Sequence, residues 1–219
     1  MKTKPLRFSW RAAFDDVVSL PEQPYRSVRE HLRTGDVVLF SGRTAASRLV
    51  RGCTGSPWSH IGMVVRLPDL PQTPLLWEAT RASKTCDIVQ GRAFDGVQLV
   101  SLDERLLSYP GVAAVRRLQG VTLSAQARGC LEQLMEAWSA KPYRNFVRQH
   151  VAGWWSSEPE PAFAQGGFCS ELVAEVYRHW RLLPAETPAH HYVPRDFASD
   201  ELVLPGGSGA LAPARLLTV

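Results

Sequence analysis

The chain has 219 residues, 45% of them hydrophobic and 21% charged, a composition typical of one globular domain that buries its own core. A disordered or fibrous protein is excluded, because the sequence contains no low-complexity tract and no repeat. The net charge of +4 comes from basic residues scattered singly or in pairs, which argues against a nucleic-acid partner. No apolar stretch is long enough to span a bilayer.

The N-terminal 20 residues mix charged and apolar side chains, so they lack the continuous apolar core of a secretory signal. We therefore expect a cytoplasmic protein, with secretion by a signal-independent route left open. No CxxC pair occurs among the four cysteines, which predicts free thiols rather than disulfides in that compartment. We expect no metal and no cofactor.

The predicted elements begin with a helical extension over residues 1–34, in which 27–33 are rich in helix-compatible charged residues. A single folded domain is expected over 35–219. Its strands are predicted from apolar runs bounded by glycine and proline, at 36–40, 60–67, 75–80, 97–102 and 112–118. The second and third of these strands are expected to form a hairpin.

Helices are predicted between and after these strands. Residues 44–51 form a short helix stopped by Gly52, and 103–107 form a helical turn. Ser124 caps a helix whose apolar stripe includes Cys130, which places that thiol in the core. The last strong helix covers 169–183, and a short strand is expected at 201–204. Together, about five strands and these helices predict an α+β protein.

Cys169 has the sequence context of a nucleophile. It follows Gly166-Gly167-Phe168 and opens the amphipathic helix, where free backbone N–H groups and the helix dipole stabilise a thiolate. Leu172 and Val173 belong to the buried stripe of this helix. Cys169, three and four residues earlier, is therefore expected to face the sheet.

A thiolate nucleophile needs an imidazole partner, so each histidine is a candidate. His179 is excluded, because ten residues along one helix separate it from Cys169 by about 15 Å. His31 and the His190-His191 pair are interpreted as solvated, whereas His150 stays open.

His60 opens a predicted strand, and Gly62 on the same face leaves room there for a partner or substrate. Glu78 has the same parity across the predicted hairpin, so both side chains can project on one face. A glutamate between Trp77 and Ala79 is costly unless it is paired. An imidazole would satisfy it.

Six segments occur in the order LRTGDVVLF, SPWSHIGMVV, WEAT, GVQLVSL, GGFCSELVAEVY and VPRDF. Over roughly residues 32–198 they resemble the papain-like NlpC-type cysteine hydrolase superfamily in its circularly permuted form, the YaeF/YiiX-type amidases. The cysteine helix follows the GD strand and the histidine strand, which is the order of the permuted branch. The resemblance implies a permuted papain-like fold, with an antiparallel sheet and the cysteine helix packed on it.

By this resemblance Cys169 is the nucleophile, His60 the general base and Glu78 the residue that orients the imidazole. The chain would then be an amidase or peptidase that cleaves an amide or ester through an acyl-enzyme. The backbone N–H of Cys169 is the expected oxyanion donor. Four residues are expected to contact the substrate: Trp58, Ser59, Tyr143 and Phe168. Of these, Tyr143 and Trp58 either add a second oxyanion donor or a wall of the site, or serve only in packing.

The substrate stays open between a cell-wall peptide amide and a lipid amide or ester. Apolar residues at helical spacing from Tyr143 to Trp155 form a stripe that either touches lipid or packs on the sheet. The alternatives are therefore a lipid acyltransferase or phospholipase that uses the same site, and a noncatalytic lipid-binding module. A peripheral membrane contact and the oligomeric state are left open.

Overall fold

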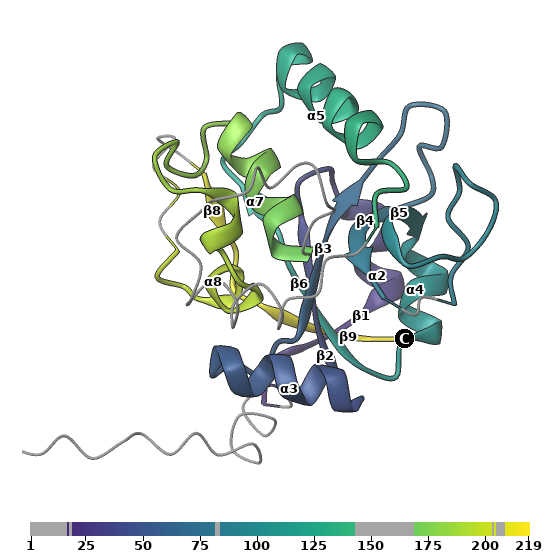
Figure 1. Ribbon diagram of the computed structural model, residues 1–219, viewed down its shortest axis with the longest axis vertical. Coiled ribbons are helices and arrows are strands. Elements are labelled where there is room, and N and C mark those ends of the chain that lie inside the picture. Colours follow the sequence, from purple (N-terminus) through teal and green to yellow (C-terminus); the bar gives the residue numbers. More distant parts are fainter. Residues whose placement is uncertain (1–16, 18, 82–83, 143–168, 203, 205–208) are drawn as a thin grey trace, which may run out of the picture.

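A computed structural model describes residues 17, 19–81, 84–142, 169–202, 204 and 209–219. Within these residues a seven-stranded sheet has the order β1-β9-β6-β2-β3-β4-β5 (Figure 1). Its pairs are antiparallel except for β1 and β9, which run parallel. The strands are β1 Glu22–Pro24, β2 Val37–Gly42, β3 His60–Val65, β4 Leu75–Thr80, β5 Gly96–Ser101, β6 Gly111–Arg116 and β9 Arg215–Thr218.

Helices pack against both faces of this sheet (Figure 1). They are α2 Tyr25–Val28, α3 Ala45–Thr54, α4 Leu102–Ser108, α5 Ala125–Trp138, α7 Cys169–His179 and α8 Pro194–Ala198, with 3-10 turns η1 Arg29–His31 and η3 Ala189–His191. Strands β7 Leu118–Gln119 and β8 Ala210–Leu211 form a separate small pair. The α+β class predicted from the sequence is confirmed, and its sheet is mostly antiparallel.

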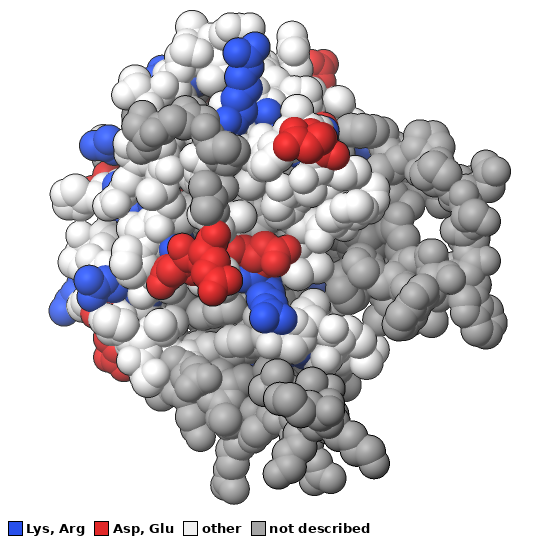
Figure 2. Space-filling model, turned by 90° about the vertical axis from the view of Figure 1, so that its left-hand side faces the viewer, with Lys and Arg blue, Asp and Glu red and all other residues white. Residues whose placement is uncertain are grey.

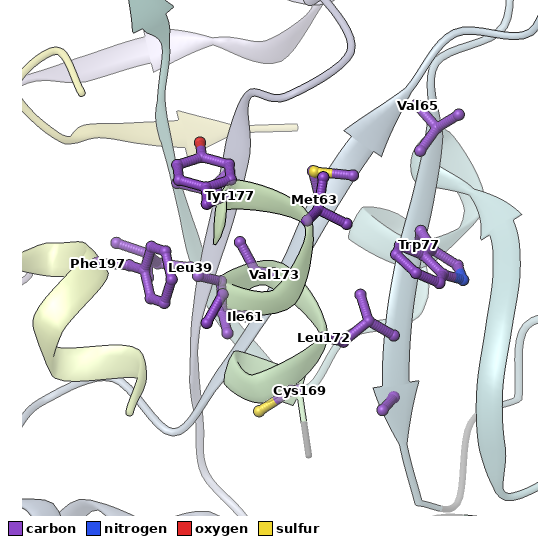
Figure 3. Packing of buried hydrophobic residues seen from close by; sticks show 14 of the residues in the cluster. Leu39, Ile61, Met63, Val65, Trp77, Cys169, Leu172, Val173, Tyr177 and Phe197 are labelled. Carbon is purple, nitrogen blue, oxygen red and sulfur yellow. The ribbon is translucent and has the colours of Figure 1, made fainter. Parts of the chain in front are cut away.

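Alternation of side chains along the central strands divides the core into two layers. Ile61, Met63 and Trp77 lie on the face that α7 covers, as Figure 3 shows. Phe40 and Leu76, at even-numbered positions, lie on the opposite face, which α2 and α4 cover. Since side chains alternate between the faces, the even-numbered His60 and Glu78 belong to the α4 side.

Strands β3 and β4 part at the end of the sheet that carries these two residues. The β3–β4 ladder runs from Val65 opposite Leu75 only as far as Met63 opposite Trp77. Strand β3 nevertheless continues beside β2 to His60, and β4 continues beside β5 to Thr80. The sheet therefore opens at this end, and residues on the α7 face can there meet residues on the α4 face.

The Gly35-Asp36 pair ties three elements together at the start of β2. Gly35 has φ +100°, a conformation that favours glycine, and its carbonyl accepts a 2.6 Å hydrogen bond from the Tyr177 hydroxyl of α7. The Asp36 carboxylate accepts hydrogen bonds from the backbone N–H groups of Arg33 and Leu118, each at 2.8 Å. This pair therefore anchors α7 on the sheet.

The N-terminal segment differs from the predicted helical extension in its described part. Residues 22–24 form β1 at the edge of the sheet instead of helix, and between residues 19 and 34 the helical elements are α2 and η1. Tyr25 and Val28 are buried against the α4 side, so this segment packs as core rather than as a solvated helix. The domain boundary at residue 34 stays a prediction.

Four other details of the prediction are wrong. Helix α3 continues through Gly52 and ends at Thr54, where the following Gly55 caps it with φ +59°. Helix α7 ends at His179, ahead of Arg181 with φ +59°, rather than at residue 183. The described residues of 201–204 contain no strand, since the chain joins the sheet later, in β9. Cys130 is half-buried rather than in the core.

Charged side chains occur in small groups of both signs on the face seen in Figure 2. No helix in the described part of the chain has both the length and the apolar character needed to cross a bilayer.

Candidate active site

A buried acid–imidazole pair lies where β3 and β4 part. His60 Nε2 and Glu78 Oε2 are 2.5 Å apart. Glu78 is fully buried and His60 is 9% exposed. The contact follows from strand parity, because both side chains project on the α4 face of neighbouring antiparallel strands. This is the arrangement that the sequence predicted for the two residues.

Gly62 makes this contact possible by leaving room for the side chains of β4. A Cβ atom built on Gly62 would lie 2.8 Å from Leu76 Cδ1 and 3.2 Å from Glu78 Cβ. The space beside His60, predicted to hold a partner or substrate, is thus filled by the side chains of Leu76 and Glu78.

The second carboxylate oxygen of Glu78 has two further partners. Gln98, directly opposite Glu78 in the β4–β5 register, donates from Nε2 to Oε1 at 3.0 Å. Arg105 of α4 forms an ion pair with the same oxygen, at 2.9 Å from Nε. Sequence reasoning missed both residues. Gln98 could have been identified from the sequence, because it is a polar residue in an otherwise apolar strand. Arg105 is identified only by the packing of α4.

These neighbours shift the protonation of the pair. Burial by itself would raise the pKa of Glu78, but the charges of Arg105 and His60 lower it to about 2. Burial disfavours the charged form of His60, but Glu78 and Cys169 outweigh it and raise its pKa to about 9. At neutral pH the pair is therefore a carboxylate and an imidazolium.

Cys169 is the first residue of α7 and completes the cluster. Its side chain is 6% exposed and lies at the end of the helix, beyond Leu172 and Val173 (Figure 3). The thiol lies close enough to the His60 imidazole to contribute to its raised pKa. Because Glu78 occupies Nε2, the ring nitrogen that remains for the thiol is Nδ1. Cys169, His60 and Glu78 are thus brought together from three separate segments.

The residues expected to contact the substrate are only partly described. Trp58 is 4% exposed and packs in the core on the α7 side. The Ser59 hydroxyl donates to the Phe40 carbonyl at 3.3 Å and accepts from the Gly42 N–H at 3.1 Å, which anchors the start of β3. Their contact with substrate stays a prediction. Tyr143, Phe168, His150 and the stripe from Tyr143 to Trp155 lie outside the described residues.

The other described histidines have separate surroundings. His179 pairs with Glu175 at 3.2 Å on the far end of α7. His31 lies in η1, and the rings of His190 and His191 contact each other in η3. All four thiols are free, and no group of three or more metal-ligating side chains occurs among the described residues.

Fold and site together define an α+β protein with a buried cysteine–histidine–glutamate cluster. No protein-family profile matches the chain, and no curated protein does. Among solved structures it is distantly similar to the metalloprotein YiiX from Escherichia coli O157:H7, DUF1105. The two are 20% identical with a TM-score of 0.47, over 85% of this chain and 97% of that chain.

Proposed function

We propose that this chain is a cysteine hydrolase of the permuted papain-like, NlpC-type class, which cleaves an amide or ester through an acyl-enzyme on Cys169. The observation that carries the proposal is the buried His60–Glu78 pair, 2.5 Å apart, with Cys169 close enough to the imidazole to help raise its pKa. The order of the segments, with the cysteine helix after the histidine strand, supports the permuted topology. A cytoplasmic location stays a prediction from the sequence.

The first half of the reaction uses the imidazolium as an acid. The Cys169 thiolate attacks the substrate carbonyl carbon, and the carbonyl π electrons move to the oxygen. The backbone N–H of Cys169, at the start of α7, stabilises this oxyanion together with the helix dipole. When the tetrahedral species collapses, the bond to the leaving amine or alcohol breaks and His60 donates its proton to that group. A thioester on Cys169 remains.

The second half uses the same imidazole as a base. Neutral His60 takes a proton from water as the water oxygen attacks the thioester carbonyl. Collapse of this second tetrahedral species releases the carboxylic acid and returns Cys169 as a thiolate beside imidazolium. Glu78 accepts the Nε2–H bond throughout, so Nδ1 stays directed at the thiol. The atoms and charges of the resting state are thereby restored.

The proposed substrate is an acyl amide or ester, with peptide and lipid acyl groups both compatible with this chemistry. The stripe that suggested a lipid substrate lies outside the described residues, so the amidase or peptidase reading stands as the proposal.

The test is a screen of acylated amino acids, phospholipids and muropeptides, with acid quenching and mass analysis of the Cys169 peptide. We expect one class to leave an acyl adduct on Cys169 and to be hydrolysed. Cys169→Ala should remove both signals with the fold intact, whereas Cys130→Ala, the matched control, should keep them. A folded Cys169→Ala protein that still turns over substrate would contradict the proposal, and absence of turnover with every class would favour a binding module.

A further inference from the structure

We propose that Arg105 is a positioning residue of this site, whose permanent charge keeps the Glu78 carboxylate ionised and in place while His60 gains and loses its proton. The inference rests on the proposed cysteine hydrolase and adds a fourth residue to its machinery. Arg105 acts through Glu78 and His60 and is not assigned a contact with substrate.

Arg105 lies beside two aromatic rings. Its side chain is buried, and its Nε lies 2.9 Å from Glu78 Oε1. The guanidinium carbon is 5.6 Å from the ring centre of Phe40 and 5.1 Å from that of Tyr109, within the range of cation–π attraction. The Phe40 ring also lies 5.4 Å from the His60 ring. One aromatic side chain therefore supports both the cation and the imidazole.

The sequence of α4 places this cation inside the protein. Ser101 caps the helix by accepting a hydrogen bond from the Glu104 N–H, and Leu102 and Leu106 are buried on the same side of the sheet as Phe40. Arg105, three residues after Leu102, falls on the same inward face. The guanidinium therefore pairs with Glu78 Oε1, whereas Oε2 contacts His60.

The need for a permanent cation follows from the reaction. When His60 is protonated, the buried carboxylate of Glu78 has two positive neighbours. After His60 has donated its proton to the leaving group, Arg105 is the cation that still compensates this carboxylate. A fully buried carboxylate without compensation is costly, and it would take up a proton instead. Glu78 would then no longer accept the Nε2–H bond as an anion.

Other titratable groups around the pair do not replace this charge. Among the described residues, Tyr109 faces the pair from the end of α4 and Cys169 faces it from α7, while Gln98 of β5 is neutral. Burial raises the pKa of Tyr109 above its ordinary value, so its hydroxyl is uncharged at neutral pH. A cysteine side chain carries no positive charge in either protonation state, so Cys169 cannot replace Arg105.

The test is the pH dependence of the iodoacetamide alkylation rate at Cys169, followed by mass analysis of its peptide. This readout does not require the substrate to be known. In Arg105→Met, Glu78 should protonate at higher pH, so the acidic midpoint of the alkylation profile should rise by about one to three pH units. Arg105→Lys should restore most of the shift. Arg105→Gln keeps an N–H donor without the charge, so its midpoint should shift as in Arg105→Met. If Arg105→Met does not fold, Arg105→Gln is used in its place.

Arg29→Met is the matched control. It breaks the 2.7 Å ion pair between Arg29 and Asp103, a residue of α4 like Arg105, without changing a partner of Glu78. It should lower stability and leave the midpoint unchanged. Folded Arg105→Met or Arg105→Gln protein with the wild-type midpoint would overturn the role of Arg105, provided that His60→Ala shifts the profile. If His60→Ala also leaves the profile unchanged, the proposed hydrolase site itself fails.

Discussion

At the scale of single residues, the two oxygens of Glu78 have separate partners. Oε2 faces the imidazole of His60, and Oε1 takes Gln98 and Arg105. This division fixes the plane of the carboxylate and hence the direction of the imidazole. Parity within the hairpin was enough to predict the first contact from sequence. The second set depends on the β4–β5 register and on the packing of α4, which no local pattern specifies.

Glu78→Gln tests the charge of this carboxylate. An amide still accepts a hydrogen bond from the imidazole but cannot stabilise imidazolium, so we expect turnover to fall by about 10²-fold or more without disappearing. The loss of the anion beside buried Arg105 should also lower the free energy of unfolding by about 3–5 kcal/mol. Steady-state kinetics and urea denaturation measure the two effects. Wild-type behaviour would place the orienting group elsewhere.

The same pair predicts a pH dependence of stability. The Glu78 pKa is lowered from 4.5 to about 2, so its contribution is present above 4.5 and is lost as the pH falls toward 2. The His60 pKa is raised from 6.5 to about 9, so its contribution is complete below 6.5 and is lost as the pH rises through 9. The difference in unfolding free energy between wild type and Glu78→Gln should therefore be largest between pH 4.5 and 6.5. A difference that does not vary with pH would refute this linkage.

At the scale of elements, the parting of β3 and β4 creates the site. Strands β2 to β6 were predictable because each is a six-residue run rich in apolar residues and close to a turn signal. Strands β1 and β9 were missed, since β1 contains Pro24 and pairs with a strand almost 200 residues away. The short β7–β8 pair gives no periodic signal. These strands form by pairing between segments far apart in the sequence, which a local sequence pattern does not indicate.

Gly62→Ala tests the spacing between β3 and β4. The added methyl group would lie 2.8 Å from Leu76 and 3.2 Å from Glu78 Cβ, so the Leu76 side chain or one of the strands must move. We expect a loss of about 1–3 kcal/mol in unfolding free energy and slower alkylation of Cys169.

Gly129→Ala is the control, because a Cβ at Gly129 in α5 meets nothing within 4 Å. This variant should gain about 0.5–1 kcal/mol through helix propensity and keep the alkylation rate. If Gly62→Ala matched Gly129→Ala in both readouts, the account of Gly62 would be wrong.

At the scale of the whole molecule, Arg116 joins the C-terminal segment to the sheet. This fully buried side chain donates to the carbonyl groups of Phe197, Ser199, Leu211 and Ala212 at 2.7–3.1 Å, and it pairs with Asp200 at 2.7 Å. The segment it binds includes α8 and leads into β9. One cation at the end of β6 thus binds several backbone carbonyls of this segment.

Arg116→Met should therefore destabilise the protein by about 3–5 kcal/mol, because several carbonyl groups lose a charged donor. Urea denaturation measures the effect. Arg215→Met removes an exposed arginine from neighbouring β9 and should change stability by less than about 0.5 kcal/mol. Equal effects of the two substitutions would show that Arg116 does not hold the segment.

The most direct test of the proposed cysteine nucleophile compares the four thiols within one protein. Cys53 and Cys86 are exposed, Cys130 is half-buried and Cys169 is buried, so accessibility alone makes Cys169 the slowest to react. Brief iodoacetamide treatment at pH 6 to 7, followed by peptide mass mapping, gives the four rates. We predict that Cys169 is the fastest in wild type and that His60→Ala returns it to the slowest place. Wild-type labelling that simply follows exposure would contradict an activated Cys169.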